Sequence, residues 1–140
     1  MSNYKKILIA IDVYSEYKKI VEKALKIAES PAHLHIMYST LPMTAYHPLG
    51  EVYDGDFFND ICLKSKEKLS EIAEHYKIPA KHIYCPIGSP AAQIHNTAHD
   101  IKADLIVIGT HGQSGLQLLL GSTANGVLHG VKCDVLAVKV

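Results

Sequence analysis

The chain has 140 residues, enough for one domain with a core of its own, and we treat residues 1–140 as a single domain. Hydrophobic residues make up 48% of the chain and charged residues 20%, which excludes a disordered or fibrous protein. The 14 basic residues are all lysines and are balanced by 14 acidic ones, so the sequence argues against binding to nucleic acid or to an anionic membrane.

Targeting and cysteine patterns favour a cytoplasmic location. The N-terminal residues carry no signal-peptide pattern, and no apolar run approaches the roughly 18 residues that span a membrane. Cys62, Cys85 and Cys133 are widely spaced and form no CxxC pair. That spacing is typical of buried thiols in a reducing compartment rather than of zinc or redox sites.

The first predicted elements are a strand, a helix and a second strand. Residues 5–11 form an apolar run typical of a strand buried on both faces. Apolar residues at helical spacing predict a helix over residues 15–29, with Ser15 as its N-cap. Residues 33–39 predict the second strand, on which we expect His33 and His35 to face solvent rather than to bind a metal. Among all nine histidines we expect no ligand pair on a helix.

The middle of the chain predicts a long loop, a long helix and an edge strand. Residues 40–55 contain two prolines and two glycines and form the loop. Residues 58–76 have the pattern of a long amphipathic helix. Residues 81–87 predict the third strand, and because Pro86 cannot donate to a ladder, this strand belongs at a sheet edge.

The last part of the chain predicts two helices and two strands. Ser89 as N-cap and Pro90 at the first position begin a helix that runs to residue 101. Residues 104–110 form a second strongly buried strand. A helix is expected from Ser122 to Gly130, followed by the final strand over residues 134–140.

The alternation of strands and helices predicts an α/β fold with one five-stranded parallel sheet and helices on both faces. Right-handed crossovers then give the strand order 3-2-1-4-5, which puts the two most apolar strands in the centre. The direction of winding reverses between strands one and four, and open sheets of this kind bind ligands beyond the carboxyl ends of such strands.

Several residues at this crevice have the chemistry of a mononucleotide site. Gly109 and Gly112 allow backbone N–H groups to approach an anion closely, and the helix that starts at Ser122 presents the positive end of its dipole. Thr123 adds a hydroxyl donor, and Asp12 is suited to accept from a ribose. Each feature also has a purely structural explanation, since Gly109 can simply end a strand, and Gly121-Ser122 and Asp12 can simply cap helices. Their convergence at one crevice favours the ligand site.

Five segments together resemble the universal stress protein family, in particular its A-type subgroup, over the whole chain. They are KILIAID, GSPAAQI, ADLIVIGTHG, LLLGSTANGVL and CDVLAVKV. The resemblance implies a flavodoxin-like or adenine nucleotide alpha-hydrolase-like fold, a cytoplasmic location and a role in protecting the cell under stress. It also implies a homodimer that pairs the last strand, Asp134 to Val140, across a two-fold axis.

The resemblance further implies contacts to an adenine nucleotide, either ATP with Mg²⁺ or AMP. Asp12 would hold the ribose, and backbone atoms near Met37 and Tyr38 would bind the adenine edge. The phosphates would be held by two groups of residues, Gly109, Thr110, His111, Gly112 and Gln113 in the loop and Gly121, Ser122 and Thr123 at the helix start. His111 has a second explanation as a solvent-facing loop residue.

Two positions depart from the family pattern G-x2-G-x9-G-[ST] and D-x-S. The spacing from Gly112 to Gly121 holds eight residues instead of nine, and the first strand is followed by Asp12-Val13-Tyr14 with Ser15 one place later. Tyr14 is therefore expected either to cover the adenine side of the pocket or to fill part of it.

Three functions are compatible with the sequence. The first is a nucleotide-binding stress-response dimer, and the alternative is a nucleotide-free protein that uses the same surface to contact a partner. The third is a slow ATPase or a protein that phosphorylates itself at Ser122, which the absence of lysine from the glycine-rich loop disfavours. We assign no catalytic residue and no metal ligand.

Overall fold

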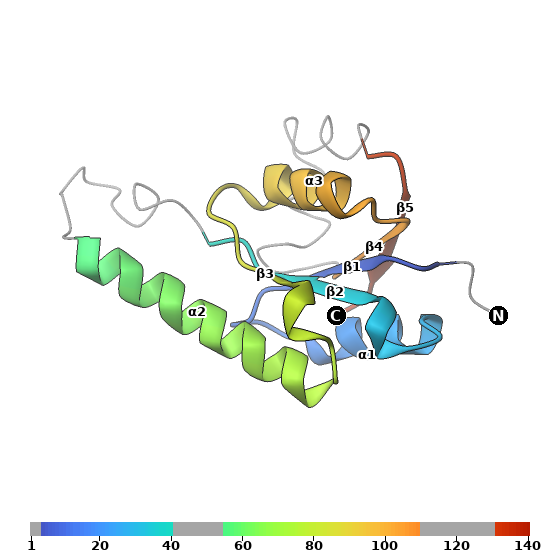
Figure 1. The fold of residues 1–140 in the computed structure, drawn as a ribbon, viewed down its shortest axis with the longest axis horizontal. Helices are drawn as coiled ribbons and strands as arrows, with labels where there is room; N and C mark the ends of the chain where they lie inside the picture. The colour runs from blue at the N-terminus through green and yellow to red at the C-terminus, as the bar shows by residue number, and fades with distance from the viewer. Residues whose placement is uncertain (1–3, 41–54, 110–130) are drawn as a thin grey trace.

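The computed structural model describes residues 4–40, 55–109 and 131–140 (Figure 1). These residues form a five-stranded parallel sheet in the order β3-β2-β1-β4-β5, as predicted. The predicted helix over residues 122–130 lies outside the described residues. The strands are β1 Ile7–Ala10, β2 Leu34–Met37, β3 Ile83–Tyr84, β4 Leu105–Gly109 and β5 Asp134–Val138. The α-helices are α1 Lys18–Ile27, α2 Gly55–His75 and α3 Pro90–Ile101, and short 3-10 turns precede β2 at Pro31–His33 and β3 at Ala80–His82.

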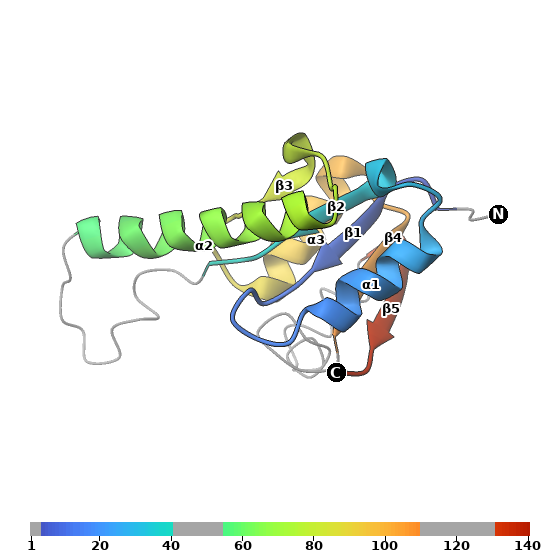
Figure 2. The ribbon, with the colours of Figure 1, turned by 90° about the horizontal axis from the view of Figure 1, so that it is seen from below.

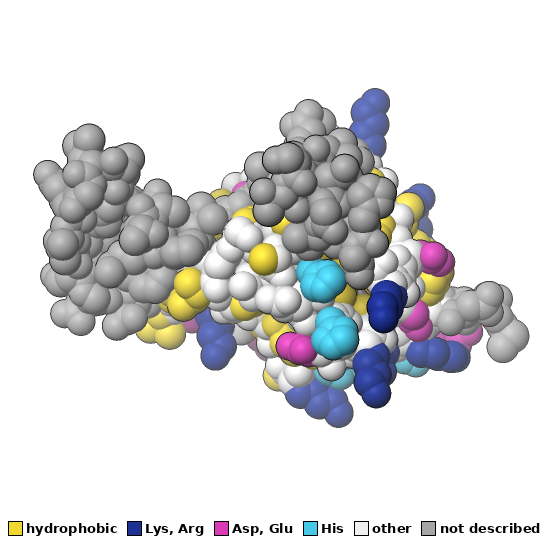
Figure 3. Space-filling model, turned by 90° about the horizontal axis from the view of Figure 1, so that it is seen from above, with side chains coloured by type: hydrophobic (Ala, Val, Ile, Leu, Met, Phe, Trp, Pro, Cys, Tyr) yellow, Lys and Arg dark blue, Asp and Glu magenta, His cyan; other side chains and the backbone are white. Residues whose placement is uncertain are grey.

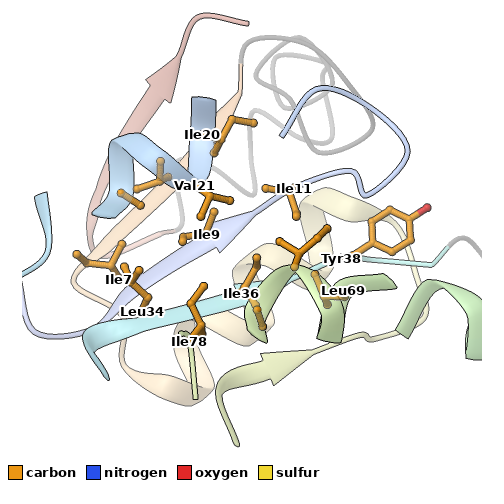
Figure 4. Close-up of a cluster of buried hydrophobic side chains, with 14 of the residues drawn as sticks. Ile7, Ile9, Ile11, Ile20, Val21, Leu34, Ile36, Tyr38, Leu69 and Ile78 are labelled. Atoms are coloured by element: carbon orange, nitrogen blue, oxygen red, sulfur yellow. The ribbon is translucent and has the colours of Figure 1, made fainter. Parts of the chain in front are cut away.

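The helices cover both faces of the sheet (Figures 1 and 2). Helices α1 and α2 lie on one face, where Ile7 and Ile9 of β1 pack in one cluster with Val21 and Leu69 (Figure 4). Helix α3 lies on the other face and packs through Ile94 and Ala98 against the alternate residues of the central strands. All side chains of β1, β2 and β4 are buried, because both faces of these strands are covered.

Strand β3 is the short edge strand that Pro86 predicts. It pairs with β2 at two positions, so the predicted run of residues 81–87 is longer than the observed strand. The Pro86 carbonyl accepts a hydrogen bond from the Thr40 amide at 2.9 Å, and Thr40 forms an isolated bridge to Ile87. The chain after β3 therefore continues beside the end of β2 without a regular ladder.

The starts of two helices test the capping predictions. Ser15 is not the N-cap of α1, because the helix begins only at Lys18 with Tyr17 in the cap position. The Ser15 hydroxyl instead donates to the Asp12 carboxylate at 2.9 Å, so it stabilises the preceding turn. Helix α3 begins as predicted, with Ser89 in the cap position and Pro90 in the first turn, although the Ser89 side chain makes no capping hydrogen bond.

Candidate functional site

The sheet reverses its direction of winding between β1 and β4, the two strands that lie side by side at its centre. The segments that follow β1 and β2 extend beyond the carboxyl ends of these strands, and β4 ends with Gly109 on the same side of the sheet. We use the name carboxyl-end crevice for the predicted ligand site at this position, whose described residues are Asp12, Tyr14, Tyr38 and Gly109. Open parallel sheets bind ligands at this position, because the connections after the two strands run to opposite faces of the sheet and leave a gap between them.

Asp12 organises the turn that leads away from β1. One carboxylate oxygen accepts from the Tyr14 amide at 2.9 Å, and the other accepts from the Ser15 hydroxyl at 2.9 Å. The Ser15 amide also donates to the Asp12 carbonyl at 3.1 Å. Asp12 therefore stabilises a turn rather than the start of α1, and the turn holds its carboxylate in one orientation.

Tyr14 forms an aromatic wall at the end of β2. Its ring lies edge-on to Tyr38, with 6.1 Å between the ring centroids. Its hydroxyl is 3.2 Å from the hydroxyl of Ser65 on α2, and the Lys68 ammonium lies 4.8 Å from the centre of its ring. Tyr14 therefore covers Tyr38 at this end of the crevice. The Tyr14 side chain is still 58% exposed, so it also presents a large surface to solvent.

The predicted adenine-binding segment at Met37 and Tyr38 lies at the same end. Both side chains are buried, so only backbone atoms are available for base recognition. The Met37 carbonyl accepts from the Ile11 amide at 3.1 Å, and the Tyr38 amide donates to the Tyr84 carbonyl at 3.1 Å. These two groups hold the end of β2 in the sheet beside the aromatic wall.

The loop after β3 that contains Gly88 is hydrogen-bonded to the residues that follow β2. The Gly88 amide donates to the Thr40 carbonyl at 2.9 Å, and the Ser39 hydroxyl donates to the Gly88 carbonyl at 2.7 Å. Gly88 has a φ of 149°, a conformation that other residues rarely adopt. A Cβ atom there would also press against the Gln93 side chain, which can move, so it is the backbone conformation that favours glycine at this turn.

The predicted phosphate-binding residues are described only in part. Gly109 is buried at the end of β4 and pairs with Val138 of β5. The other predicted phosphate ligands lie outside the described residues, and they are Thr110, His111, Gly112, Gln113, Gly121, Ser122 and Thr123. The structure thus brings together Asp12, Tyr14 and Tyr38 from the ribose and adenine sides of the predicted site.

Two further polar residues of α2 contact Tyr14 at the crevice, and neither is predicted from the sequence. Ser65 is fully buried and Lys68 is exposed, and each contacts Tyr14. Both lie within a long amphipathic helix, so hydrophobic periodicity alone does not separate them from other positions on that helix. Only the position of Tyr14, which depends on the Asp12 turn, shows their role.

The histidines correct one expectation. His35 does not face solvent, because its side chain is buried at 7% exposure against two other rings. His95 and His99 lie one turn apart on α3, and they line a hollow of about 510 Å³ together with Cys133. Histidine and lysine side chains lie beside one another on the face that α3 covers (Figure 3). In the described part of the chain, however, no three side chains of His, Cys, Asp or Glu lie close enough together to hold a metal ion.

Among the residues that the structure describes, no helix is both long enough and apolar enough to cross a membrane.

Comparison with known proteins gives one consistent family. The Universal stress protein family matches residues 3–139. Universal stress protein A homolog 2 of Coxiella burnetii is 40% identical over 144 residues, which cover all of this chain and 98% of that protein.

Two solved structures share the fold. A universal stress protein solved in complex with cAMP is 28% identical, with a TM-score of 0.64 and 98% of each chain covered. A hypothetical protein that served as a test case of structural genomics is 26% identical, with a TM-score of 0.71, and the match covers 98% of this chain and 96% of that one. Their similarity over nearly the whole length agrees with the parallel sheet described above.

Proposed function

The chain belongs to the universal stress protein family, and from this premise we propose that it binds an adenine nucleotide, ATP or AMP, in the carboxyl-end crevice. We further propose that it acts in the cytoplasm as a homodimer that protects the cell under stress. The observation that carries the nucleotide proposal is the convergence of a fixed carboxylate, Asp12, and an aromatic wall, Tyr14 and Tyr38, at the edge where the sheet reverses.

Asp12 is the proposed ribose ligand. Ribose hydroxyls donate hydrogen bonds, and a carboxylate is an acceptor with about four lone-pair sites. Because the Tyr14 amide and the Ser15 hydroxyl already hold the carboxylate, little side-chain entropy is lost when a ligand arrives. This preorganisation favours binding of a ribose at the end of β1.

Tyr14 is the proposed cover of the adenine base. It reaches the end of β2 and keeps a large exposed surface there, which an aromatic base can contact. Stacking of a base on an aromatic side chain contributes roughly 1–3 kcal/mol by alanine substitution. The cAMP complex of a relative 28% identical supports an adenine ligand for this fold.

The phosphates are assigned to the glycine-rich segment from Gly109 to Thr123, whose backbone amides and hydroxyls are suited to anions. Lys68 supplies a positive charge on the α2 side of the crevice. If ATP is the ligand, Mg²⁺ would be held mainly by phosphate oxygens and water, as is usual for this ion. Asp12 is the one acidic side chain that the described part of the crevice offers for that shell.

The test is an assay of the freshly purified protein for adenine nucleotide after denaturation, followed by calorimetric titration with ATP and Mg²⁺. We expect micromolar binding that Gly112→Val or Gly121→Val abolishes, because a side chain at either position blocks the approach of backbone amides to the phosphates. Circular dichroism and thermal unfolding serve as the control that each variant keeps its fold. Binding that is absent at millimolar ATP contradicts the proposal.

The proposed dimer pairs β5 with a second copy of itself. In the described sheet β5 is an edge strand that pairs with β4, and Val135 is 36% exposed on it. Val135→Glu places like charges close to the two-fold axis, so we expect a monomer in sedimentation experiments. Leu63→Glu is the matched control, because Leu63 is an exposed apolar residue on α2. Helix α2 packs against β2 and β3, whereas β5 is the edge strand at the other side of the sheet. A dimer that survives Val135→Glu contradicts this interface.

The second candidate is a nucleotide-free protein that contacts a partner through the same surface. It is favoured by the eight-residue spacing between Gly112 and Gly121 and by the large exposed surface of Tyr14. The same titration separates the two functions, since this candidate predicts neither co-purified nucleotide nor heat of binding. Tyr14→Ala would then weaken the capture of a partner rather than the binding of ATP.

A further inference from the structure

A positively charged hollow lies at the opposite end of the sheet from the carboxyl-end crevice. It has a volume of about 550 Å³ and lies at the amino ends of β1, β2 and β3, next to the last turn of α3. Four lysines and one carboxylate line it, although the whole chain has a formal net charge of zero. We call it the amino-end hollow, and its charged residues are Lys5, Lys6, Lys81, Lys102 and Asp100.

Three stacked rings form a wall of the amino-end hollow. The His35 and His82 rings are stacked with 3.8 Å between their centroids, and Tyr84 lies nearly parallel to His35 at 5.8 Å. The His35 Nδ1 atom is 2.9 Å from the Tyr84 hydroxyl. The His82 Nδ1 atom is 3.0 Å from the Leu34 carbonyl, and because a carbonyl can only accept, this nitrogen carries a proton. The rings are thus held in place before any ligand binds.

The surroundings of His35 oppose a positive charge on its ring. Burial and, to a smaller extent, the positive charges of His82 and Lys6 together lower the pKa of His35 to about 4. Two carboxylates outside the hollow only partly offset the lysines. Glu29 pairs with Lys5 at 3.8 Å, and Asp104 accepts hydrogen bonds from the backbone amides of Lys5 and Lys6.

We propose that the amino-end hollow binds a phosphate anion that carries more than one negative charge, and that binding is coupled to proton uptake by His35, whose ring is stacked on His82. The lysines come from three separate segments of the chain and surround the hollow, so they can contact several oxygens of one anion. Lysine binds phosphate as a compact point charge with three donors, and a protonated imidazole adds further N–H donors. The anion is either inorganic or the phosphate group of a small organic molecule.

Proton coupling follows from the charges. A bound anion offsets the repulsion from Lys6 and His82, so the pKa of His35 rises when the anion binds. A group whose pKa is higher in the bound state takes up a proton on binding, and affinity therefore increases as the pH falls toward the pKa of the free protein. Each proton taken up changes the affinity by up to about tenfold per pH unit in that window.

The experiment is a titration of the whole protein with pyrophosphate and, separately, with phenyl phosphate, near pH 7 and near pH 5. Calorimetry gives the affinity, and NMR signals of the histidine rings report on His35 and His82. We expect tighter binding at the lower pH, with shifts of both ring signals. His35→Gln is expected to bind but to lose the additional gain at low pH, so protonation of the anion itself cancels in the comparison. Tighter binding of pyrophosphate indicates an inorganic anion, and tighter binding of phenyl phosphate indicates an organic one.

Charge variants locate the site. Lys6→Gln with Lys81→Gln removes two exposed charges from the hollow and is expected to weaken binding about tenfold, whereas Asp100→Asn strengthens it. Lys23→Gln with Lys26→Gln on α1 removes the same charge elsewhere and leaves binding unchanged. Gly112→Val, in the proposed nucleotide site, also leaves it unchanged. The proposal is overturned by absence of binding at millimolar anion, by equal loss in both double variants, or by ring signals that do not move.

Discussion

The two ends of the sheet differ in how their residues are encoded. At the carboxyl-end crevice, the predicted ligands lie in short segments, such as Asp12 after β1 and the glycines after β4. A sequence motif is therefore enough to predict them. At the amino-end hollow, the residues come from four separate segments of the chain, including Lys6 before β1, His35 in β2, and Lys102 after α3. The first kind of site can be found from spacing, but the second exists only once the strand order is known.

Both ends depend on the same sheet, and the largest effect is expected at a core residue of β2 that lies between them in the sequence. Ile36 is fully buried in β2, between His35 of the hollow and Tyr38 of the crevice. We expect Ile36→Ala to lower the free energy of unfolding by about 2–5 kcal/mol, because it leaves a cavity in the main core. Chemical denaturation measures this loss, and binding at both ends should weaken together.

The matched control for Ile36 is Ile87→Ala, since Ile87 is 52% exposed. Its effect on the free energy of unfolding is expected to stay within about 0.5 kcal/mol. If the two variants lose equal stability, the sheet is not the shared support of the two sites.

The pH dependence of stability is the next largest effect and concerns the amino-end hollow alone. Burial, and then the charges of His82 and Lys6, lower the pKa of His35 to about 4 from its ordinary 6.5. The unfolded chain therefore takes up a proton at higher pH than the native protein, and the stabilising effect present above pH 6.5 is lost as the pH falls toward 4. We expect a loss on the order of 1–3 kcal/mol, after allowance for partial access of water.

His35→Gln should remove this part of the pH dependence, so its stability relative to the native protein improves as the pH is lowered. His99→Gln, a change to an exposed histidine on α3, should not. Urea unfolding at several pH values between neutral and weakly acidic makes the comparison. Parallel curves for His35→Gln and the unchanged protein contradict the assignment.

A smaller effect separates the structural role of Asp12 from its proposed role as a ligand. Asp12→Ala removes the acceptors for the Tyr14 amide and the Ser15 hydroxyl, so we expect a loss of about 1–2 kcal/mol in unfolding free energy and weaker nucleotide binding. Ser15→Ala removes one of these hydrogen bonds and keeps the carboxylate. It should cost about 1 kcal/mol or less and leave binding nearly intact.

If Ser15→Ala weakens nucleotide binding as much as Asp12→Ala does, the carboxylate acts through the turn rather than on the ligand. Calorimetry on both variants, together with their unfolding curves, decides between these roles.

The sheet could be predicted from the sequence because its signals are local. Apolar runs gave β1 and β4, and Pro86 placed β3 at an edge, where the structure has it. Ser15 was misassigned because a serine before a helix has two uses, and here the nearby Asp12 carboxylate holds its hydroxyl in a turn. Capping patterns do not separate these two uses without the local backbone.

The misassigned histidine had a different cause. Alternation along an edge-proximal strand predicts an exposed side chain, but His35 is covered by rings of the next strand and of the turn before it. The sequence does not predict the roles of Lys68 and Ser65 for a similar reason. Their contacts with Tyr14 join residues that are far apart in the sequence. Local sequence patterns do not predict contacts between segments that are distant in the chain.

The most direct test of the account is the titration of ATP and Mg²⁺ into the unchanged protein and into Gly112→Val, by calorimetry, beside the double variant Lys6→Gln and Lys81→Gln. We expect micromolar binding that Gly112→Val abolishes and that the lysine variant leaves intact, because the nucleotide is proposed to bind in the carboxyl-end crevice. Binding that survives Gly112→Val but is lost in the lysine variant would contradict it and would place the nucleotide at the amino-end hollow.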